Sequence, residues 1–144
     1  MKIEKILVPY DATPSSEKAI KKIFALIENQ GSKVVLLSCI RDKATFGFFK
    51  TKSDKKEIEQ EKNKAKKYHE IIKKVAEKQG ILMNSKIIKS DLESQSIIEY
   101  AKKEKVDMIV MSRSKLSTHA EKMYYNSTVD AVFKNAPCPF LYIP

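Results

Sequence analysis

Apolar residues along this chain gather in short continuous runs, which are separated by longer segments with apolar residues at helical spacing. Continuous apolar runs of this length are typical of strands that are buried on both faces of a parallel sheet. The pattern predicts five strands, at residues 5–10, 34–40, 81–89, 106–111 and 140–143.

The first predicted helix has recognisable signals at both ends. We expect Thr13 as its N-cap and Pro14 as its first residue, because a threonine hydroxyl accepts a free backbone N–H and proline fits the first turn. Residues 29–31 end the helix, since Gly31 tolerates a left-handed conformation. The core face of this helix carries Ile20, Ile23, Phe24 and Ile27.

Three further helices are expected between the later strands. Residues 54–79 predict a long helix that Gly80 ends, and Ser94 or Ser96 is expected to cap the next one. Residues 127–130 resemble a capping box that opens the last helix, and residues 136–139 break it. The long helix is expected to turn Ile58, Ala65, Tyr68, Ile72, Val75 and Ala76 inward. The next helix carries Ile97, Ile98 and Ala101, and the last runs through Val132 and Phe133.

The order of elements is therefore β-α-β-α-β-α-β-α-β. Regular alternation of helices with buried strands predicts an α/β fold, a single Rossmann-like α/β/α sandwich with a five-stranded parallel sheet. No Pro-, Gly- or Ser-rich linker and no internal repeat interrupts the pattern, so residues 1–144 are expected to form a single domain.

The chain carries 28 Lys and Arg against 18 Asp and Glu, a formal net charge of +10. Such a charge suits an anionic partner. In the long helix, however, lysines alternate with glutamates, which is typical of a solvated face. Aromatic residues do not interleave with arginines as in a single-strand binding surface. We therefore expect no nucleic-acid partner, and a polyanion-binding module remains an alternative.

No apolar run approaches the ~20 residues that span a bilayer, and the N-terminus lacks the apolar segment of a secretory signal. Cys39 and Cys138 are the two cysteines, far apart and in no CxxC pair. This usage argues against a disulfide scaffold and a cysteine zinc site. We expect a cytoplasmic protein with reduced thiols and no membrane partner.

Ligands of open parallel sheets bind beyond the carboxyl ends of the strands. Three segments are expected to meet there, at residues 10–13, 38–40 and 112–127. Asp11 is the acid at the end of the first strand, where it suits a ribose hydroxyl or a metal ion. Its alternative role is that of a turn residue or helix cap.

Catalytic signals are sparse, so we expect no catalytic residue and no enzyme of standard type. His69 lies among lysines and glutamates and is expected at the surface, while His119 lies in the polar segment after the fourth strand. The chain has no GxSxG elbow, no phosphate-binding GxxxxGK[ST] loop and no GxGxxG fingerprint. The segment 41–53 contains Phe46, Phe48 and Phe49, which could cover the sheet, form a lid or contact a partner; packing is favoured.

Several segments share features with one known family: Ile6 to Asp11 followed by Ser15 to Ala19, the runs 34–40 and 106–111, and the C-terminal segments 126–132 and 136–143. Together they resemble the universal stress protein family. The resemblance covers nearly the whole chain. It implies a five-stranded parallel sheet and a homodimer that forms through the last strand, Phe140–Ile143.

Many members of that family bind ATP through a G-x2-G-x9-G-[ST] loop, in which glycines let backbone amides approach the phosphates. Here Ser112, Lys115 and Asn126 stand where the glycines are expected, while Ser127 and Asp11 keep the hydroxyl and the acid. The resemblance therefore implies a small stress-response regulator with a degenerate site for ATP or AMP, with magnesium at Asp11 only through a bound nucleotide. An ATP-hydrolysing switch is the alternative. The site residues expected on this basis are Tyr10, Asp11, Ala12, Ser38, Ser112, Arg113, Lys115, Asn126, Ser127 and Thr128.

Overall fold

The computed structural model describes residues 2–42, 44–45, 47–112 and 119–144, the side chains of 119–126 excepted. Strands and helices alternate along the chain, as the sequence predicts. The elements are β1 (Lys5–Pro9), α1 (Pro14–Ile27), β2 (Lys33–Arg41), α2 (Lys52–Lys78), β3 (Leu82–Ser90), α3 (Glu93–Lys103), β4 (Met108–Ser112), α4 (His119–Asn135) and β5 (Phe140–Ile143).

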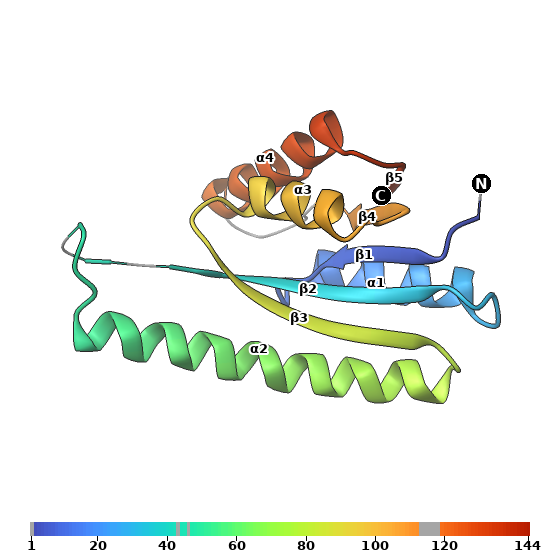
Figure 1. Ribbon diagram of the computed structural model, residues 1–144, viewed down its shortest axis with the longest axis horizontal. Coiled ribbons are helices and arrows are strands. Elements are labelled where there is room, and N and C mark those ends of the chain that lie inside the picture. Colours follow the sequence, from blue (N-terminus) through green and yellow to red (C-terminus); the bar gives the residue numbers. More distant parts are fainter. Residues whose placement is uncertain (1, 43, 46, 113–118) are drawn as a thin grey trace.

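The five strands form one parallel sheet in the order β3-β2-β1-β4-β5. Side chains alternate across the sheet, so neighbouring residues of β1 enter different cores. Ile6 packs with residues of α1 and α2, whereas Leu7 packs with residues of α3 and α4. Figure 1 shows α3 and α4 on one side of the sheet and α2 on the other. The predicted α/β/α sandwich is confirmed.

The helix ends follow local chemistry where that chemistry is strong. The hydroxyl of Thr13 accepts a hydrogen bond from the Ser16 N–H, and Pro14 begins α1. After α2, Gly80 adopts φ +68°, and the next amide, that of Ile81, bonds the Ala76 carbonyl at 2.9 Å. This is the wrap-around bond that a left-handed residue permits. At the end of α1, Asn29 takes φ 64° directly after the cap, a position that we had expected glycine to fill.

Three sequence predictions about helices are wrong. The helix α4 begins at His119 and not at residue 127, because the intervening segment contains Ala, Glu, Lys and Met, which favour helix without forming an apolar face. Neither Ser94 nor Ser96 caps α3, whose N-cap is Leu92. Val75 points outward from α2 and is exposed.

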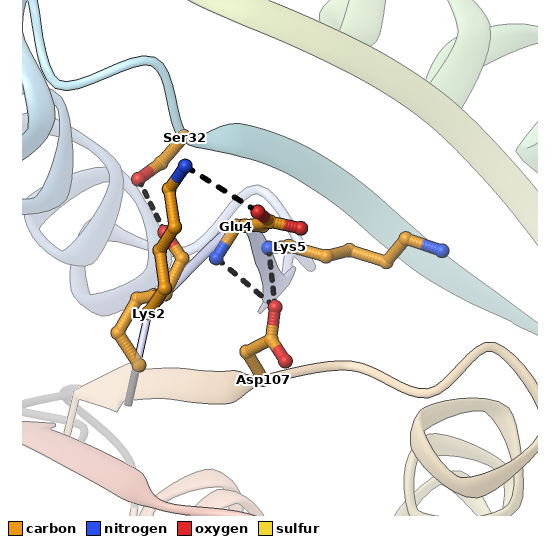
Figure 2. A network of polar contacts seen from close by, with 6 residues as sticks. Lys2, Glu4, Lys5, Ser32 and Asp107 are labelled. Atoms are coloured by element: carbon orange, nitrogen blue, oxygen red, sulfur yellow. Dashed lines mark hydrogen bonds and ion pairs between the residues drawn. The ribbon is translucent and has the colours of Figure 1, made fainter.

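The amino-terminal edge of the sheet is held by one carboxylate. Asp107 Oδ2 accepts hydrogen bonds from the backbone N–H groups of Lys5 at 2.9 Å and Glu4 at 3.0 Å (Figure 2). Ser32 donates to the Ile3 carbonyl at 2.8 Å beside it, and Lys2 pairs with Glu4. These polar groups bond one another and fix the start of β1. No helix among the described residues is long and apolar enough to cross a bilayer.

Candidate functional site

A pocket of about 200 Å³ lies beyond the carboxyl ends of β1 and β2, against the inner side of α2. Pockets for drug-sized ligands measure ~300–1,000 Å³, so this one has room for part of a nucleotide, such as its base and sugar. Its lining residues are Tyr10, Asp11, Ala12, Ser38, Cys39, Ile40, Glu61, Lys64, Ala65 and Tyr68.

Asp11 organises the loop that leads from β1 to α1. Its Oδ1 atom accepts hydrogen bonds from the Thr13 N–H at 3.0 Å, the Thr13 hydroxyl at 2.5 Å and the Ser16 hydroxyl at 2.9 Å. The turn role that the sequence left open is therefore present, and it uses one oxygen of an exposed carboxylate. Ala12 follows with φ 63°, a conformation that costs a residue with a Cβ about 1–2 kcal/mol. Strain of this kind concentrates at binding sites.

Tyr10 forms the floor of the pocket. Its hydroxyl donates a 2.5 Å hydrogen bond to Glu17 Oε1, and its ring meets the Tyr68 ring edge-on at 6.4 Å between centroids. Burial, together with the neighbouring Glu17 carboxylate, raises the pKa of Tyr10 well above its ordinary range. The phenol therefore stays neutral, and the two rings give the pocket an aromatic wall.

Behind this floor lies a buried polar chain that the sequence did not predict. The Ser38 hydroxyl donates to the Tyr10 carbonyl at 2.7 Å and lies 2.7 Å from His69 Nε2, while His69 Nδ1 bonds the Ser85 hydroxyl. Because the Ser38 hydroxyl donates its proton to the Tyr10 carbonyl, His69 Nε2 must donate to Ser38 and Nδ1 must accept from Ser85. A histidine that donates to a serine cannot act as its general base, so this is not the protonation pattern of a nucleophile and its base.

The surface position predicted for His69 is wrong. The side chain is 1% exposed, although lysines and glutamates surround it in sequence. Helix α2 is amphipathic, and His69 lies on the side that faces the sheet, where serines of β2 and β3 take the place of water. Burial lowers the pKa of His69 to about 4, so the ring is neutral near pH 7.

A second unpredicted residue, Glu93, lies at the start of α3 on the opposite face of the sheet. Burial and the nearby charge of Asp11 raise the pKa of the Glu93 carboxyl to about 7. Burial and Glu93 in turn raise the pKa of the Cys39 thiol to about 12. The carboxyl end of the sheet therefore holds two acids, one of which carries its charge only part of the time at neutral pH.

The third segment expected at the site, residues 112–127, is described only in part, and Ser112 is not among the residues that line the pocket. Ser112 ends β4 and is fully buried, and its hydroxyl finds no hydrogen-bond partner in the described part of the chain. Such an orphan costs about 1–3 kcal/mol unless something bonds it. Ser127 lies about two turns inside α4 and is exposed, so the expected anion site at a helix N-terminus beginning there is wrong.

Of the remaining residues expected at the site, the structure describes the side chain of Thr128 but not those of Arg113, Lys115 and Asn126. Thr128 is buried on α4. Asn126 belongs to the same helix, but its side chain lies outside the described residues, as do Arg113 and Lys115 entirely. No group of three or more acidic, histidine or cysteine side chains that could hold a metal ion occurs among the residues described.

Comparison with known proteins decides the family. Residues 2–144 match the universal stress protein family. The chain belongs to this family. A universal stress protein of Methanocaldococcus jannaschii is 26% identical over 140 residues, covering 97% of this chain and 81% of the relative.

Solved universal stress proteins share the fold. UspA from Lactobacillus plantarum superposes with a TM-score of 0.84 at 19% identity, covering 100% of this chain and 99% of that one. A family protein from Arabidopsis thaliana with AMP bound gives a TM-score of 0.71 at 18% identity, covering 97% and 90%. At this identity the likeness shows the fold alone.

In this universal stress protein, sequence reasoning located one wall of the pocket and missed the other. Tyr10, Asp11, Ala12 and Ser38 do line it. The wall from α2, formed by Glu61, Lys64, Ala65 and Tyr68, was not predicted. A weak signal existed, because Ala65 and Tyr68 were recognised as inward-facing positions, but periodicity does not say what an inward face covers.

Proposed function

We propose that this universal stress protein binds an adenine nucleotide, AMP or ATP, weakly and without chemical conversion, as a small homodimeric regulator. The observation that carries the proposal is the pocket at the carboxyl ends of β1 and β2, the edge at which parallel sheets bind ligands. The AMP-bound relative from Arabidopsis supports the ligand class.

The described residues fit the base and sugar better than the phosphates. Ile40, Ala65 and Tyr68 offer apolar and aromatic surface for a base, and the Asp11 carboxylate can accept hydrogen bonds from a ribose diol. Side chains at the glycine positions of the family loop weaken the phosphate cradle. We therefore expect dissociation constants between micromolar and millimolar, about −8 to −4 kcal/mol.

Titration calorimetry with AMP, and with ATP plus Mg²⁺, tests the proposal. We expect Asp11→Ala to weaken binding about tenfold, since it removes a charged acceptor. Asp91→Ala, an exposed aspartate at the same end of the sheet, is the matched control and should keep the wild-type affinity. No heat at millimolar nucleotide would overturn the proposal. Equal affinity in wild type and Asp11→Ala would place the site elsewhere.

The proposed absence of catalysis is tested separately, by measuring phosphate release from ATP. The described pocket holds one cation, Lys64, and its histidine neighbour is a donor to Ser38. Phosphate release from ATP and Mg²⁺ at the rate of a protein-free blank is the expected result, and release that disappears in Asp11→Ala would show a true hydrolase.

The homodimer is proposed from the edge strand. β5 is the last strand of the sheet, and Tyr142 is 44% exposed on it. It lines a shallow, mostly apolar hollow of about 360 Å³ together with Val129, Asp130, Phe133 and Phe140. An exposed apolar edge is a template for pairing with another strand, and a second copy would bury it.

A further inference from the structure

The loop between β2 and α2 is held at its base by one buried carboxylate. Asp54, 4% exposed, accepts hydrogen bonds from the Thr45 N–H at 2.9 Å, the Thr45 hydroxyl at 2.5 Å and the Thr51 N–H at 3.0 Å. The Thr51 hydroxyl accepts the Asp54 N–H in return. These bonds, led by those from Thr45, hold the pKa of Asp54 far below its ordinary range. A salt bridge of 2.5 Å between Lys50 and Asp42 adds a second tie across the loop.

The tip of this loop presents aromatic side chains to solvent. Phe48 is fully exposed and Phe49 is 76% exposed, so these two rings do not cover the sheet. Phe46, the third phenylalanine of the segment, lies outside the described residues. In Figure 1 the loop forms the left-hand end of the molecule, where β2 turns back into α2. We call Gly47, Phe48 and Phe49 the aromatic tip. A clamped base that exposes apolar rings is the arrangement of a contact surface, because nothing within the described chain stabilises the rings there.

Three lysines follow the aromatic tip along the chain, at the start of α2. Lys52, Lys55 and Lys56 lie in the first two turns of α2, and all three are exposed. Positive charge at a helix N-terminus opposes the helix dipole. None of the three forms an ion pair with another described residue. The acids near them are Asp54, buried in the same first turn and bonded to Thr45 and Thr51, and the exposed Glu57. An anionic partner would compensate this unfavourable placement.

We propose that the aromatic tip and these lysines bind the surface of an anionic membrane, with the two rings in the headgroup–acyl boundary and the lysines on lipid phosphates. A lipid surface supplies an apolar interior beside negative charge and needs no complementary pocket, which suits a convex tip. Single-stranded nucleic acid fits less well, since its sites combine a basic groove with stacking rings. This proposal departs from the expectation of no membrane partner, which rested on the absence of a spanning segment; peripheral contact does not need one.

Co-sedimentation with phosphatidylglycerol vesicles tests the proposal. The full chain should partition onto these vesicles at low salt, bind phosphatidylcholine vesicles much more weakly, and dissociate as salt rises. The double variant Phe48→Ser, Phe49→Ser should lose at least about tenfold in partition. The pair Lys55→Gln, Lys56→Gln should lose about fivefold for each charge. All of these side chains are exposed, so we expect the variants to fold.

Matched controls distinguish binding through the aromatic tip and its lysines from non-specific hydrophobic or electrostatic adsorption. Leu26→Ser removes an exposed apolar side chain on α1, and Lys66→Gln with Lys67→Gln removes two exposed charges farther along α2. Both should bind vesicles nearly as wild type does. The proposal is overturned if phosphatidylglycerol vesicles bind no protein, or if the controls lose as much as the tip variants. It is equally overturned if the phenylalanines govern self-association or the anisotropy of a labelled DNA strand while vesicle binding is absent.

Discussion

His69 is predicted to make the protein less stable as the pH falls. Its pKa is lowered by burial from 6.5 to about 4. The unfolded chain therefore binds a proton first, and the free energy of unfolding falls as the pH drops through the window from 6.5 to 4. Between pH 7 and pH 5 this one group removes about 2 kcal/mol of stability, since each unit of pKa difference is worth about 1.4 kcal/mol.

Glu93 is predicted to act in the opposite direction over the same range. Burial, and then the charge of Asp11, raise its pKa from 4.5 to about 7. The folded chain binds the proton first, so the free energy of unfolding rises as the pH falls from 7 to 4.5. From pH 7 to pH 5 the gain is again about 2 kcal/mol. The two groups lie on opposite faces of the sheet and should act additively.

In the wild-type protein the two contributions should cancel, so the free energy of unfolding should change little between pH 7 and pH 5. A variant that lacks one of the two groups should show the contribution of the other. Urea unfolding at pH 7 and pH 5 is compared for wild type, His69→Asn, Glu93→Gln and the double variant. We expect His69→Asn to gain about 2 kcal/mol on acidification, Glu93→Gln to lose about 2 kcal/mol, and the other two to change little. The comparison is between pH values for each protein, so a loss of stability common to both pH values does not matter.

Glu99→Gln is the control for the helix that carries Glu93. Glu99 is exposed on α3, where it accepts a hydrogen bond from the Gln95 amide, and Glu99→Gln should keep the pH dependence of wild type. Asp54 and Asp107, whose pKa values are lowered, titrate below pH 5 even in the unfolded chain and are common to all variants. The same change from pH 7 to pH 5 in all four proteins would refute the reasoning.

Three further predictions concern separate parts of the molecule. Tyr142→Asp should shift light scattering at tens of micromolar from dimer toward monomer while Lys67→Asp should not; a wild-type monomer mass would contradict the proposed dimer. Lys105 follows the C-cap of α3 with φ 51°, and its replacement by glycine should raise the free energy of unfolding by about 0.5–1 kcal/mol. Lys102→Gly, inside α3, should lower it by about that much in chemical denaturation. Ser112→Ala should leave the free energy of unfolding unchanged or raise it by about 1 kcal/mol, since it removes a buried hydroxyl with no hydrogen-bond partner in the described part of the chain; a clear loss of stability would mean that the hydroxyl has a partner.

The order of elements and the layers of the fold were readable from the sequence. Buried parallel strands appear as continuous apolar runs, and the final strand, Phe140–Ile143, was predicted to the residue. Thr13, Pro14 and Gly80 mark helix ends through bonds that span a few residues. Asp11 could be located for the same reason, because the end of a strand and the following turn are local features.

Features that depend on contacts between distant segments were decided only by the tertiary structure. His69 is buried because β2 and β3 bring Ser38 and Ser85 to it, from 31 and 16 residues away. Nothing in its charged neighbourhood indicates that. Glu93 owes its raised pKa to burial at an edge where the β1 loop also arrives. The pocket wall from α2 and the exposure of the aromatic tip likewise depend on how distant segments pack. A periodic pattern states which residues turn inward, whereas the packing of elements decides what they meet, and protonation and binding depend on that environment.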